Sequence, residues 1–249
     1  MQDGTRGMEL NGRVALVTGA GVRLGREIAL ALARAGADVV VHYHRSRGPA
    51  EEVVREIRSL GRRAIAVGLD LAATDQLDGL VARCIDELGA VDVLINSASI
   101  FQRGTVFTET SESWDRHLDI NLKAPFFLAQ SFARRLRPTQ HGHIIHIADW
   151  RALRPGTQYM AYTVSKAGLV TLTRSLALAL APNVQVNAIA PGGILPPPGD
   201  PVGYFARLPE RIPLRRVGSP REITHAVLYL LGSDFVTGEV IQVTGGEQL

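Results

Sequence analysis

Short runs of β-branched and other apolar residues alternate along the chain with longer segments whose apolar positions recur at helical spacing. Seven of the short runs are typical of strands: Val14–Thr18, Val39–Tyr43, Ala64–Leu69, Val91–Asn96, His143–Ile147, Gln185–Ile189 and Val240–Val243. The clearest helical segments are Leu24–Ala35, Pro49–Leu60, Thr74–Glu87, Asn121–Leu136, Ala161–Leu180 and Pro220–Leu231. This alternation predicts repeated βαβ units that build a parallel sheet.

The strand candidates also indicate how the sheet is covered. Val39–Val41 and Val91–Ile95 are almost continuously apolar, which suits strands that are buried on both faces. We therefore expect an α/β fold with a doubly wound, seven-stranded parallel sheet and helices on both faces. A chain of 249 residues is expected to form one domain, residues 10–249, after a flexible N-terminus at residues 1–9. The proline-rich stretch 191–217 is long for a plain connection and predicts a substrate-binding loop segment.

Composition excludes several classes of protein. The chain has 27 basic and 24 acidic residues, and a net charge of +3 is too weak to indicate nucleic-acid binding. Cys84 is the single cysteine, which excludes an internal disulfide and fits a reducing compartment. His141, His143 and His146 cluster without a carboxylate trio, so no metal site is predicted. Neither a signal peptide nor a membrane-spanning segment is predicted, and we expect a cytoplasmic protein.

A glycine-rich turn follows the first strand candidate and leads into the first helix candidate. Its sequence is Thr18-Gly19-Ala20-Gly21-Val22-Arg23-Leu24-Gly25. Glycines let the backbone turn sharply and approach a pyrophosphate, and the free N–H groups at the start of a helix favour its negative charge. Because the turn lies between a strand and a helix, it indicates a dinucleotide site.

The end of the second strand candidate indicates which dinucleotide binds. A cofactor with a free ribose 2′-hydroxyl usually meets Asp or Glu at this position, whereas a 2′-phosphate favours arginine. The chain has His44-Arg45-Ser46 there and no acid until Glu51. Arg45 can bind phosphate oxygens and Ser46 can donate its hydroxyl. We expect NADPH rather than NADH; the alternative is that the arginines form a solvated patch.

Tyr162 and Lys166 are four residues apart at the start of a helical segment, so they share one face of the helix. Only two of the 27 basic residues are lysines, which makes this spacing unlike a chance pairing. An ammonium near a tyrosine hydroxyl stabilises the phenolate and lowers the pKa of the phenol, so that it can donate a proton near neutral pH. The pair predicts a catalytic site; the alternative is an amphipathic helix with an exposed lysine.

Other motifs stand at matching points along the chain: Asp70-Leu71 after the third strand, Asn96-Ser97-Ala98 after the fourth, Asn121, Tyr162-Thr163-Val164-Ser165-Lys166, Pro191-Gly192, Val236-Thr237-Gly238 and Gly245-Gly246. Together with the glycine-rich turn, they make the sequence resemble the short-chain dehydrogenase/reductase family from Val14 to Gly246. The resemblance implies a single-domain Rossmann-like fold, an NAD(P)(H) oxidoreductase and a homotetramer.

The same resemblance assigns roles to individual residues. Tyr162 would donate the proton, Lys166 would hold the nicotinamide ribose and Asn121 would organise a proton-relay water. Pattern and resemblance together assign cofactor contacts to Gly19, Arg23, Leu24, His44, Arg45, Ser46, Asp70, Leu71, Asn96, Ala98, Ser99, Tyr162, Lys166, Pro191, Gly192 and Ile194. In this set Asp70 would meet the adenine, and Asn96 with Ala98 would lie along the cofactor.

Three positions depart from the family pattern. Asp149 stands where the family usually has a serine thirteen residues before the tyrosine, Arg23 replaces a usual glycine, and Ser97 replaces an asparagine. The combination of Arg23, Asp149, Ser99 and Phe101 with His42-Tyr43-His44-Arg45-Ser46 resembles the pteridine reductase branch of the family. The branch implies a pterin in contact with Arg23, Ser99, Phe101, Asp149 and Tyr162. Phe101 would stack on the pterin ring, and Asp149 would join Tyr162 in proton delivery.

The chemistry of Asp149 supports this interpretation independently. A serine hydroxyl can donate to a ketone oxygen as charge develops, whereas an ionised carboxylate only accepts and would repel that oxygen. A pterin offers amino and ring N–H donors instead, and its flat ring suits stacking on Phe101. Alternatively, Asp149 caps a helix or loop and Phe101 packs in the core. We therefore expect an NADPH-dependent pterin reductase; the alternatives are a carbonyl reductase of the same family and a non-catalytic NADPH-binding protein.

Overall fold

The computed structural model describes residues 7–137, 139–197 and 203–249. Seven strands form one parallel sheet, as the sequence predicts, and their order is β3-β2-β1-β4-β5-β6-β7. The strands are β1 (Val14–Val17), β2 (Asp38–Tyr43), β3 (Ala64–Gly68), β4 (Val93–Asn96), β5 (Gly142–Ile147), β6 (Val184–Pro191) and β7 (Val240–Val243). The predicted α/β class with a doubly wound sheet is confirmed.

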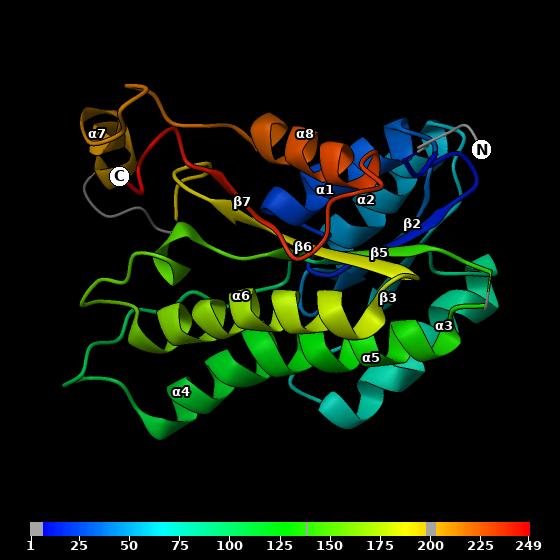
Figure 1. Ribbon diagram of the computed structural model, residues 1–249, viewed down its shortest axis with the longest axis horizontal. Helices are drawn as coiled ribbons and strands as arrows, with labels where there is room; N and C mark the ends of the chain where they lie inside the picture. Colours follow the sequence, from blue (N-terminus) through cyan, green and yellow to red (C-terminus); the bar gives the residue numbers. More distant parts are fainter. Residues whose placement is uncertain (1–6, 138, 198–202) are drawn as a thin grey trace.

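Helices cover both faces of this sheet, as Figure 1 shows. One face carries α1 (Arg23–Arg34), α2 (Arg47–Ser59) and α8 (Pro220–Leu231). The other carries α3 (Leu77–Leu88), α4 (Ser111–Leu118), α5 (Ala124–Arg135) and α6 (Met160–Leu180). A short helix, α7 (Tyr204–Arg207), lies beyond the carboxyl end of β6. None of the helices in these described ranges combines the length and apolar character that a membrane crossing requires.

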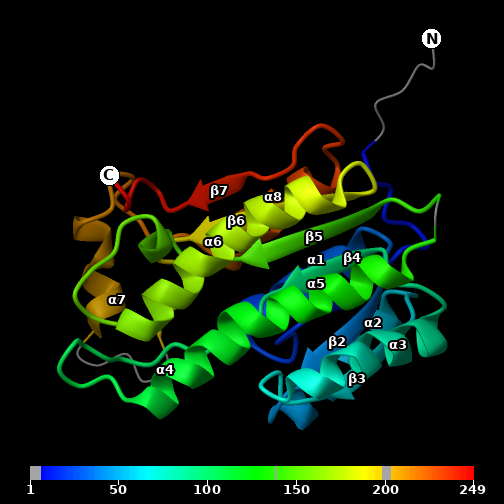
Figure 2. The ribbon, with the colours of Figure 1, turned by 60° about the horizontal axis from the view of Figure 1, so that its bottom comes forward.

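The two larger hydrophobic clusters among the described residues hold the layers together, one on each side of the sheet. Ile28 and Leu32 of α1 pack with Val227 of α8 on the first face. Leu128 of α5 and Leu80 of α3 pack on the second, where Figure 2 shows α5 and α6 lying next to each other. Burial on both faces explains why the strands read as continuous apolar runs rather than alternating ones.

Most of the predicted elements lie within a few residues of the observed ones, but α4 was not predicted. Its sequence is mainly polar, and it begins with a cap in which Thr110 Oγ1 accepts a hydrogen bond from the N–H of Ser113 at 3.2 Å. The predicted helix 121–136 begins later, at Ala124, after a π-helical turn at Asp119–Lys123.

Two predicted segments lie only partly within the described residues. Residues 198–202, which include Pro198 and Pro201 of the predicted loop segment 191–217, are outside them, as are residues 1–6 of the predicted flexible N-terminus. The rest of the loop segment contains α7 and the 3-10 turn Leu208–Glu210. Near the N-terminus, Met8 donates its N–H to Leu231 O at 2.9 Å.

Candidate active site

A cavity of about 1280 Å³ lies at the carboxyl ends of the strands, where parallel α/β sheets bind ligands. Most of the predicted site residues line it: Gly19, Arg23, Leu24, His44, Asp70, Leu71, Ala98, Ser99, Phe101, Asp149, Tyr162, Lys166, Pro191, Gly192 and Ile194. Four predicted site residues do not line it: Arg45, Ser46, Asn96 and Asn121. Its lining comes from the segments that follow each of the strands β1 to β6 and from the last residues of β2, β5 and β6.

Asp149 and Tyr162 meet inside this cavity. Tyr162, in the first turn of α6, donates its hydroxyl to Asp149 Oδ2 at 2.8 Å. Asp149 follows β5 and also caps the 3-10 turn Trp150–Ala152, because its Oδ1 accepts from the N–H of Arg151 at 2.8 Å. The capping role that the sequence left as an alternative is therefore present together with the contact to tyrosine.

The pKa of Tyr162 is raised well above 10, which corrects the prediction that Lys166 lowers it. Burial is the largest cause, and the charge and hydrogen bond of Asp149 add to it. Lys166 is buried as well; its Nζ donates to Ile147 O at 2.6 Å and lies 5.8 Å from the Tyr162 ring centroid. Burial lowers the pKa of Lys166 to about 8. The positive charge that lowers the pKa of Tyr162 belongs to Arg151 instead.

Phe101 forms part of an aromatic wall rather than part of the core. Its side chain is 37% exposed and stacks on Tyr159, with ring centroids 4.2 Å apart and an interplanar angle of 8°. Tyr162 meets the same ring in a T-shaped contact at 4.7 Å. Because Tyr159 covers one face of Phe101, a flat ligand can stack only on the opposite face.

Arg23 has a backbone conformation that glycine adopts more easily than any other residue. Its φ is +54°, in the left-handed region that costs a side-chain-bearing residue roughly 1–2 kcal/mol. The guanidinium reaches Pro196 O, to which Nη2 donates at 2.6 Å, so Arg23 connects the glycine-rich turn to the loop segment after β6. A strained residue at a cavity points to a role for its side chain.

The glycine-rich turn is held from behind by His42, which the sequence did not assign a role. Gly19 donates its N–H to His42 Nδ1 at 3.2 Å, and His42 Nε2 lies 3.1 Å from Leu69 O. A Cβ on Gly19 would lie 2.9 Å from Ala98 Cα, and one on Gly25 would lie 2.3 Å from Gly19 O. Only glycines allow this close packing, which gives the turn the shape of a phosphate cradle.

The end of β2 carries the charges expected beside the adenosine half of a dinucleotide. His44 Nε2 lies 3.5 Å from Asp70 Oδ2, and Arg116 of α4 lies 3.6 Å from the same oxygen. Burial opposes ionisation of Asp70, but these partners and the N–H of Ala72 lower its pKa overall. Arg45 is exposed to solvent. Arg116 was missed by sequence reasoning because it belongs to the unpredicted helix α4.

Ser46 lies directly behind the glycine-rich turn. Its Oγ is 2.8 Å from the position that a Cβ on Gly21 would occupy. The hydroxyl and the turn are thus adjacent, even though Ser46 is not part of the cavity wall.

Asn121 ties the loop after β4 to α6 through all of its amide atoms. Its Oδ1 accepts from Ile100 N at 3.0 Å and from Ser99 Oγ at 3.1 Å, and its Nδ2 donates to Ile100 O and to Ser165 Oγ, each at 3.1 Å. The π-helical turn Asp119–Lys123 carries this residue. Asn121 therefore positions Ser99 at the cavity wall.

Asn96 is buried behind the cavity and faces β5. Its Nδ2 lies 3.1 Å from His146 Nδ1. Within the described residues, Asn96 Oδ1 and His146 Nε2 have no hydrogen-bond partner.

Glu247, near the end of the chain, is a second carboxyl in the cavity that the sequence did not reveal. Its Oε2 accepts from the N–H of Gly193 at 2.9 Å. Burial raises the pKa of Glu247 and the charge of Asp149 adds to the shift, while the hydrogen bond from Gly193 and the charge of Arg151 oppose it. No local pattern could have found this residue, because it reaches the site only through the folded path of β7.

The sheet order, the glycine-rich turn and the buried Tyr162–Lys166 pair together define a dinucleotide-dependent oxidoreductase. The chain belongs to the short-chain dehydrogenase/reductase family: residues 19–248 match the family model described as enoyl-(acyl carrier protein) reductase. It is an NAD(P)-dependent oxidoreductase of this family.

Relatives within the family differ in what they act on. The chain is 33% identical to 2-dehydro-3-deoxy-D-gluconate 5-dehydrogenase of Escherichia coli, over 95% of this chain and 96% of that protein. It is 34% identical to 3-oxoacyl-(acyl-carrier-protein) reductase of Synechocystis, over 95% and 97%. Among solved structures, FolM alternative dihydrofolate reductase 1 of Brucella canis, complexed with NADP, superposes with a TM-score of 0.93 at 35% identity, over 96% and 95%.

Proposed function

We propose that this protein is an NADPH-dependent reductase of pterins. The substrate would be a 7,8-dihydropterin, such as dihydromonapterin, dihydrobiopterin or dihydrofolate, whose C=N bond is reduced to the tetrahydro level. The observation that carries this proposal is the 2.8 Å hydrogen bond from the Tyr162 hydroxyl to Asp149 inside the cavity.

The carboxylate favours a nitrogen heterocycle over a simple ketone. Asp149 can accept from the amino and ring N–H groups of a pterin, but it would repel the negative charge that develops on a ketone oxygen. Phe101 supplies a flat apolar surface next to Asp149 and Tyr162. The structural similarity to FolM, at 35% identity, supports the same substrate class.

In the proposed reaction the cofactor would supply the hydride and the protein would supply the proton. Bound along the glycine-rich turn, a nicotinamide dinucleotide would supply hydride to ring carbon C6. Tyr162 would pass its hydroxyl proton to N5, with Asp149 in contact with the hydroxyl. Lys166 would hold the nicotinamide ribose. Asn121, whose amide is fully bonded to protein groups, would organise the water that returns a proton through the backbone of its π-helical turn. Arg23, Ser99 and Phe101 would position the pterin.

The preference for NADPH rests on the end of β2. Arg45 is exposed there and free to turn toward a 2′-phosphate, and Ser46 Oγ lies beside the glycine-rich turn. The solved FolM structure contains NADP, which supports the proposal. Apart from Asn96, which is buried behind it, the remaining predicted cofactor contacts line the same cavity, including Asp70, which would meet the adenine, and Ile194 beyond β6.

A carbonyl reductase of the same family is the second candidate, because curated relatives include a 3-oxoacyl reductase at 34% identity. Purified protein should be tested with NADPH on 7,8-dihydrobiopterin, 7,8-dihydromonapterin and 7,8-dihydrofolate, and in parallel on a panel of ketones and 3-oxoacyl thioesters. Turnover of dihydropterins would support the proposal. Turnover of ketones with none of dihydropterins would reject it in favour of the second candidate.

The proposal includes the organisation of the protein. Residues 10–249 would form one NADP-binding domain, with 191–217 as its substrate-binding segment; Ile194 and Arg207 of that segment line the cavity. The family membership supports a homotetramer. The single cysteine, which is buried and unpaired, fits a cytoplasmic location.

A further inference from the structure

The two carboxylate oxygens of Asp149 have different partners: Arg151 contacts one and Tyr162 the other. Its N–H donates to Oδ1 at 2.8 Å and its guanidinium Nη1 approaches the same oxygen at 3.5 Å. Oδ2 is thereby left to the Tyr162 hydroxyl at 2.8 Å. Both contacts of Arg151 and the single contact of Tyr162 therefore fix the rotation of one carboxylate.

Three aromatic rings hold the guanidinium in this place. Its Cζ lies 4.9 Å from the Trp150 ring centroid, 5.7 Å from Phe101 and 5.9 Å from Tyr159. All three distances are within the reach of about 6 Å over which a cation is attracted to an aromatic ring. The Arg151 side chain is 24% exposed and that of Asp149 is 15%, so solvent screens their attraction only partly.

Lys166 and Glu247 also lie near Asp149, but their hydrogen bonds go to other groups than its carboxylate. Lys166 directs its ammonium to Ile147 O, and Glu247 accepts from the N–H of Gly193. Tyr162 is the remaining titratable group in contact with the carboxylate. Arg151 is thus the cation that directly faces the Asp149–Tyr162 pair.

We propose that Arg151 is a positioning residue for proton delivery. By pairing with Oδ1 it keeps Oδ2 aimed at the phenol, and it keeps a positive charge near the oxygen that becomes negative when Tyr162 gives up its proton. The inference rests on the proposed function only in that Tyr162 is the donor, which holds for pterin and carbonyl substrates alike. Burial and Asp149 raise the pKa of Tyr162, and Arg151 is the group that opposes this shift.

The test compares Arg151→Gln with Arg151→Lys in the full-length protein. Without the charge, Tyr162 becomes a weaker acid, and we expect kcat to fall by about tenfold with little change in KM. Proton transfer becomes more rate-limiting, so the solvent deuterium isotope effect on kcat should rise. The alkaline limb of the kcat–pH profile should move to higher pH. Lysine keeps the charge and should restore most of kcat.

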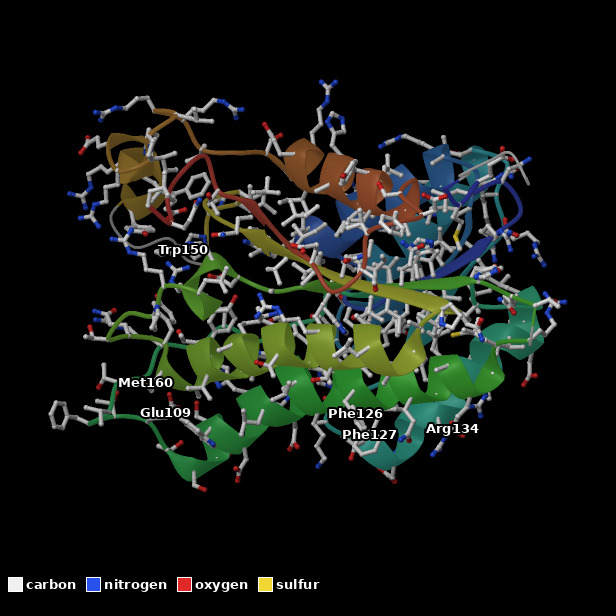
Figure 3. The ribbon with its side chains drawn as sticks, viewed as in Figure 1. Glu109, Phe126, Phe127, Arg134, Trp150 and Met160 are labelled. Atoms are coloured by element: carbon white, nitrogen blue, oxygen red, sulfur yellow. The ribbon has the colours of Figure 1, made fainter. Side chains whose placement is uncertain are left out.

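The matched control is Arg134→Gln, which removes an exposed arginine from the end of α5 opposite the site. Figure 3 shows Arg134 and Trp150 toward opposite ends of the molecule. A further variant, Trp150→Leu, removes one of the three rings that surround the Arg151 guanidinium. It should lower kcat, but less than Arg151→Gln does. If Arg151→Gln folds poorly, Arg151→Lys and Trp150→Leu still distinguish a role in positioning the proton donor from a purely structural role.

Several results would overturn the inference: an unchanged isotope effect and pH profile, an increase in KM alone, or a lysine variant no more active than the glutamine variant. A purely structural role predicts these results. The measurements use whichever substrate the wild type reduces. Reduction of ketones alone would therefore reject the pterin proposal while leaving the role of Arg151 open to the same test.

Discussion

Tyr162 Oη lies 2.8 Å from Asp149 Oδ2, although the two residues belong to different elements. Tyr162 is on the first turn of α6, and Asp149 follows the end of β5. Both residues line the cavity at the carboxyl edge of the sheet, together with Lys166. A phenol, a carboxylate and an ammonium are thus gathered where a dinucleotide and a small substrate can meet.

Tyr162→Phe should remove most turnover while leaving NADPH binding nearly intact. The variant keeps the ring that packs on Phe101 but loses the proton, and a positioned acid typically contributes about 10²–10⁴-fold. Steady-state rates measure the loss, and quenching of protein fluorescence by NADPH measures binding. Wild-type rates in the variant would contradict the assigned role of Tyr162.

Asp149→Ser should change which substrate is preferred. Serine can donate a hydrogen bond to a ketone oxygen but cannot accept from pterin N–H groups as a carboxylate does. We expect dihydropterin reduction to fall by at least about tenfold and ketone reduction to rise relative to it, since a charge-assisted hydrogen bond is lost. Asp149→Asn controls for size. An unchanged ratio of the two activities would mean that Asp149 does not select the substrate.

The strands were predictable from sequence because each is a buried, β-branched run such as Val39–Val41. Helix α4 was not, since its apolar positions are too few to outline a face, and with it the contact of Arg116 to Asp70 was missed. The contact of Asp149 with Tyr162 followed from the family pattern.

The roles of Arg151 and Glu247 could not be predicted in the same way. The Arg151 guanidinium lies among Phe101, Trp150 and Tyr159, whose rings come together only in the folded chain. Glu247 is far from the other site residues in the sequence and contacts Gly193. The pKa of Tyr162 was predicted in the wrong direction because spacing shows that Lys166 shares its face but not how deeply both are buried. Burial is a property of tertiary packing, and no local pattern reports it.

Arg45→Asp should shift cofactor preference from NADPH toward NADH. The substitution removes a phosphate partner and adds a charge that repels a 2′-phosphate but accepts from a free ribose hydroxyl. Losing one charge-assisted contact of about 1.5–3 kcal/mol corresponds to at least a tenfold change in the ratio of kcat/KM values. Arg55→Asp, an exposed change further along α2, is the control. The same preference in Arg45→Asp and wild type would refute the assignment to the 2′-phosphate.

Arg23→Gly should separate backbone strain from side-chain function. Glycine adopts the φ of +54° without cost, so the free energy of unfolding should stay level or rise by about 1 kcal/mol, although glycine's greater freedom in the unfolded chain offsets part of this gain. The variant loses the 2.6 Å contact to Pro196 O and the guanidinium in the cavity, so KM for NADPH and for substrate should increase. Urea unfolding and steady-state kinetics on the same preparation measure both effects. Improved stability with unaltered KM values would show that the arginine serves neither ligand.

Three of the four buried histidines, His42, His143 and His146, should make the protein sensitive to mild acid. Burial lowers the pKa of His42 and of His143 to about 4 and that of His146 to about 3. In the unfolded chain these groups titrate near pH 6.5, so between about 4 and 6.5 the unfolded state binds more protons. The stability of the folded state is therefore unaffected by these histidines above pH 6.5. As pH falls below 6.5 the free energy of unfolding decreases, by about 1.4 kcal/mol for each histidine at pH 5.5.

The carboxylates affect stability over a lower pH range than the histidines, so the two effects can be measured separately. Ion pairs and hydrogen bonds hold the pKa of Asp78 and of Glu222 at about 2, so their contribution is lost only below about pH 4.5. Urea unfolding at pH 7.5, 6.5 and 5.5 should show a free energy of unfolding that decreases across the last interval. His143→Gln removes one of the three sites and should make the decrease smaller by about a third. A flat wild-type profile from pH 7.5 to 5.5 would mean that these imidazoles are not held neutral by burial.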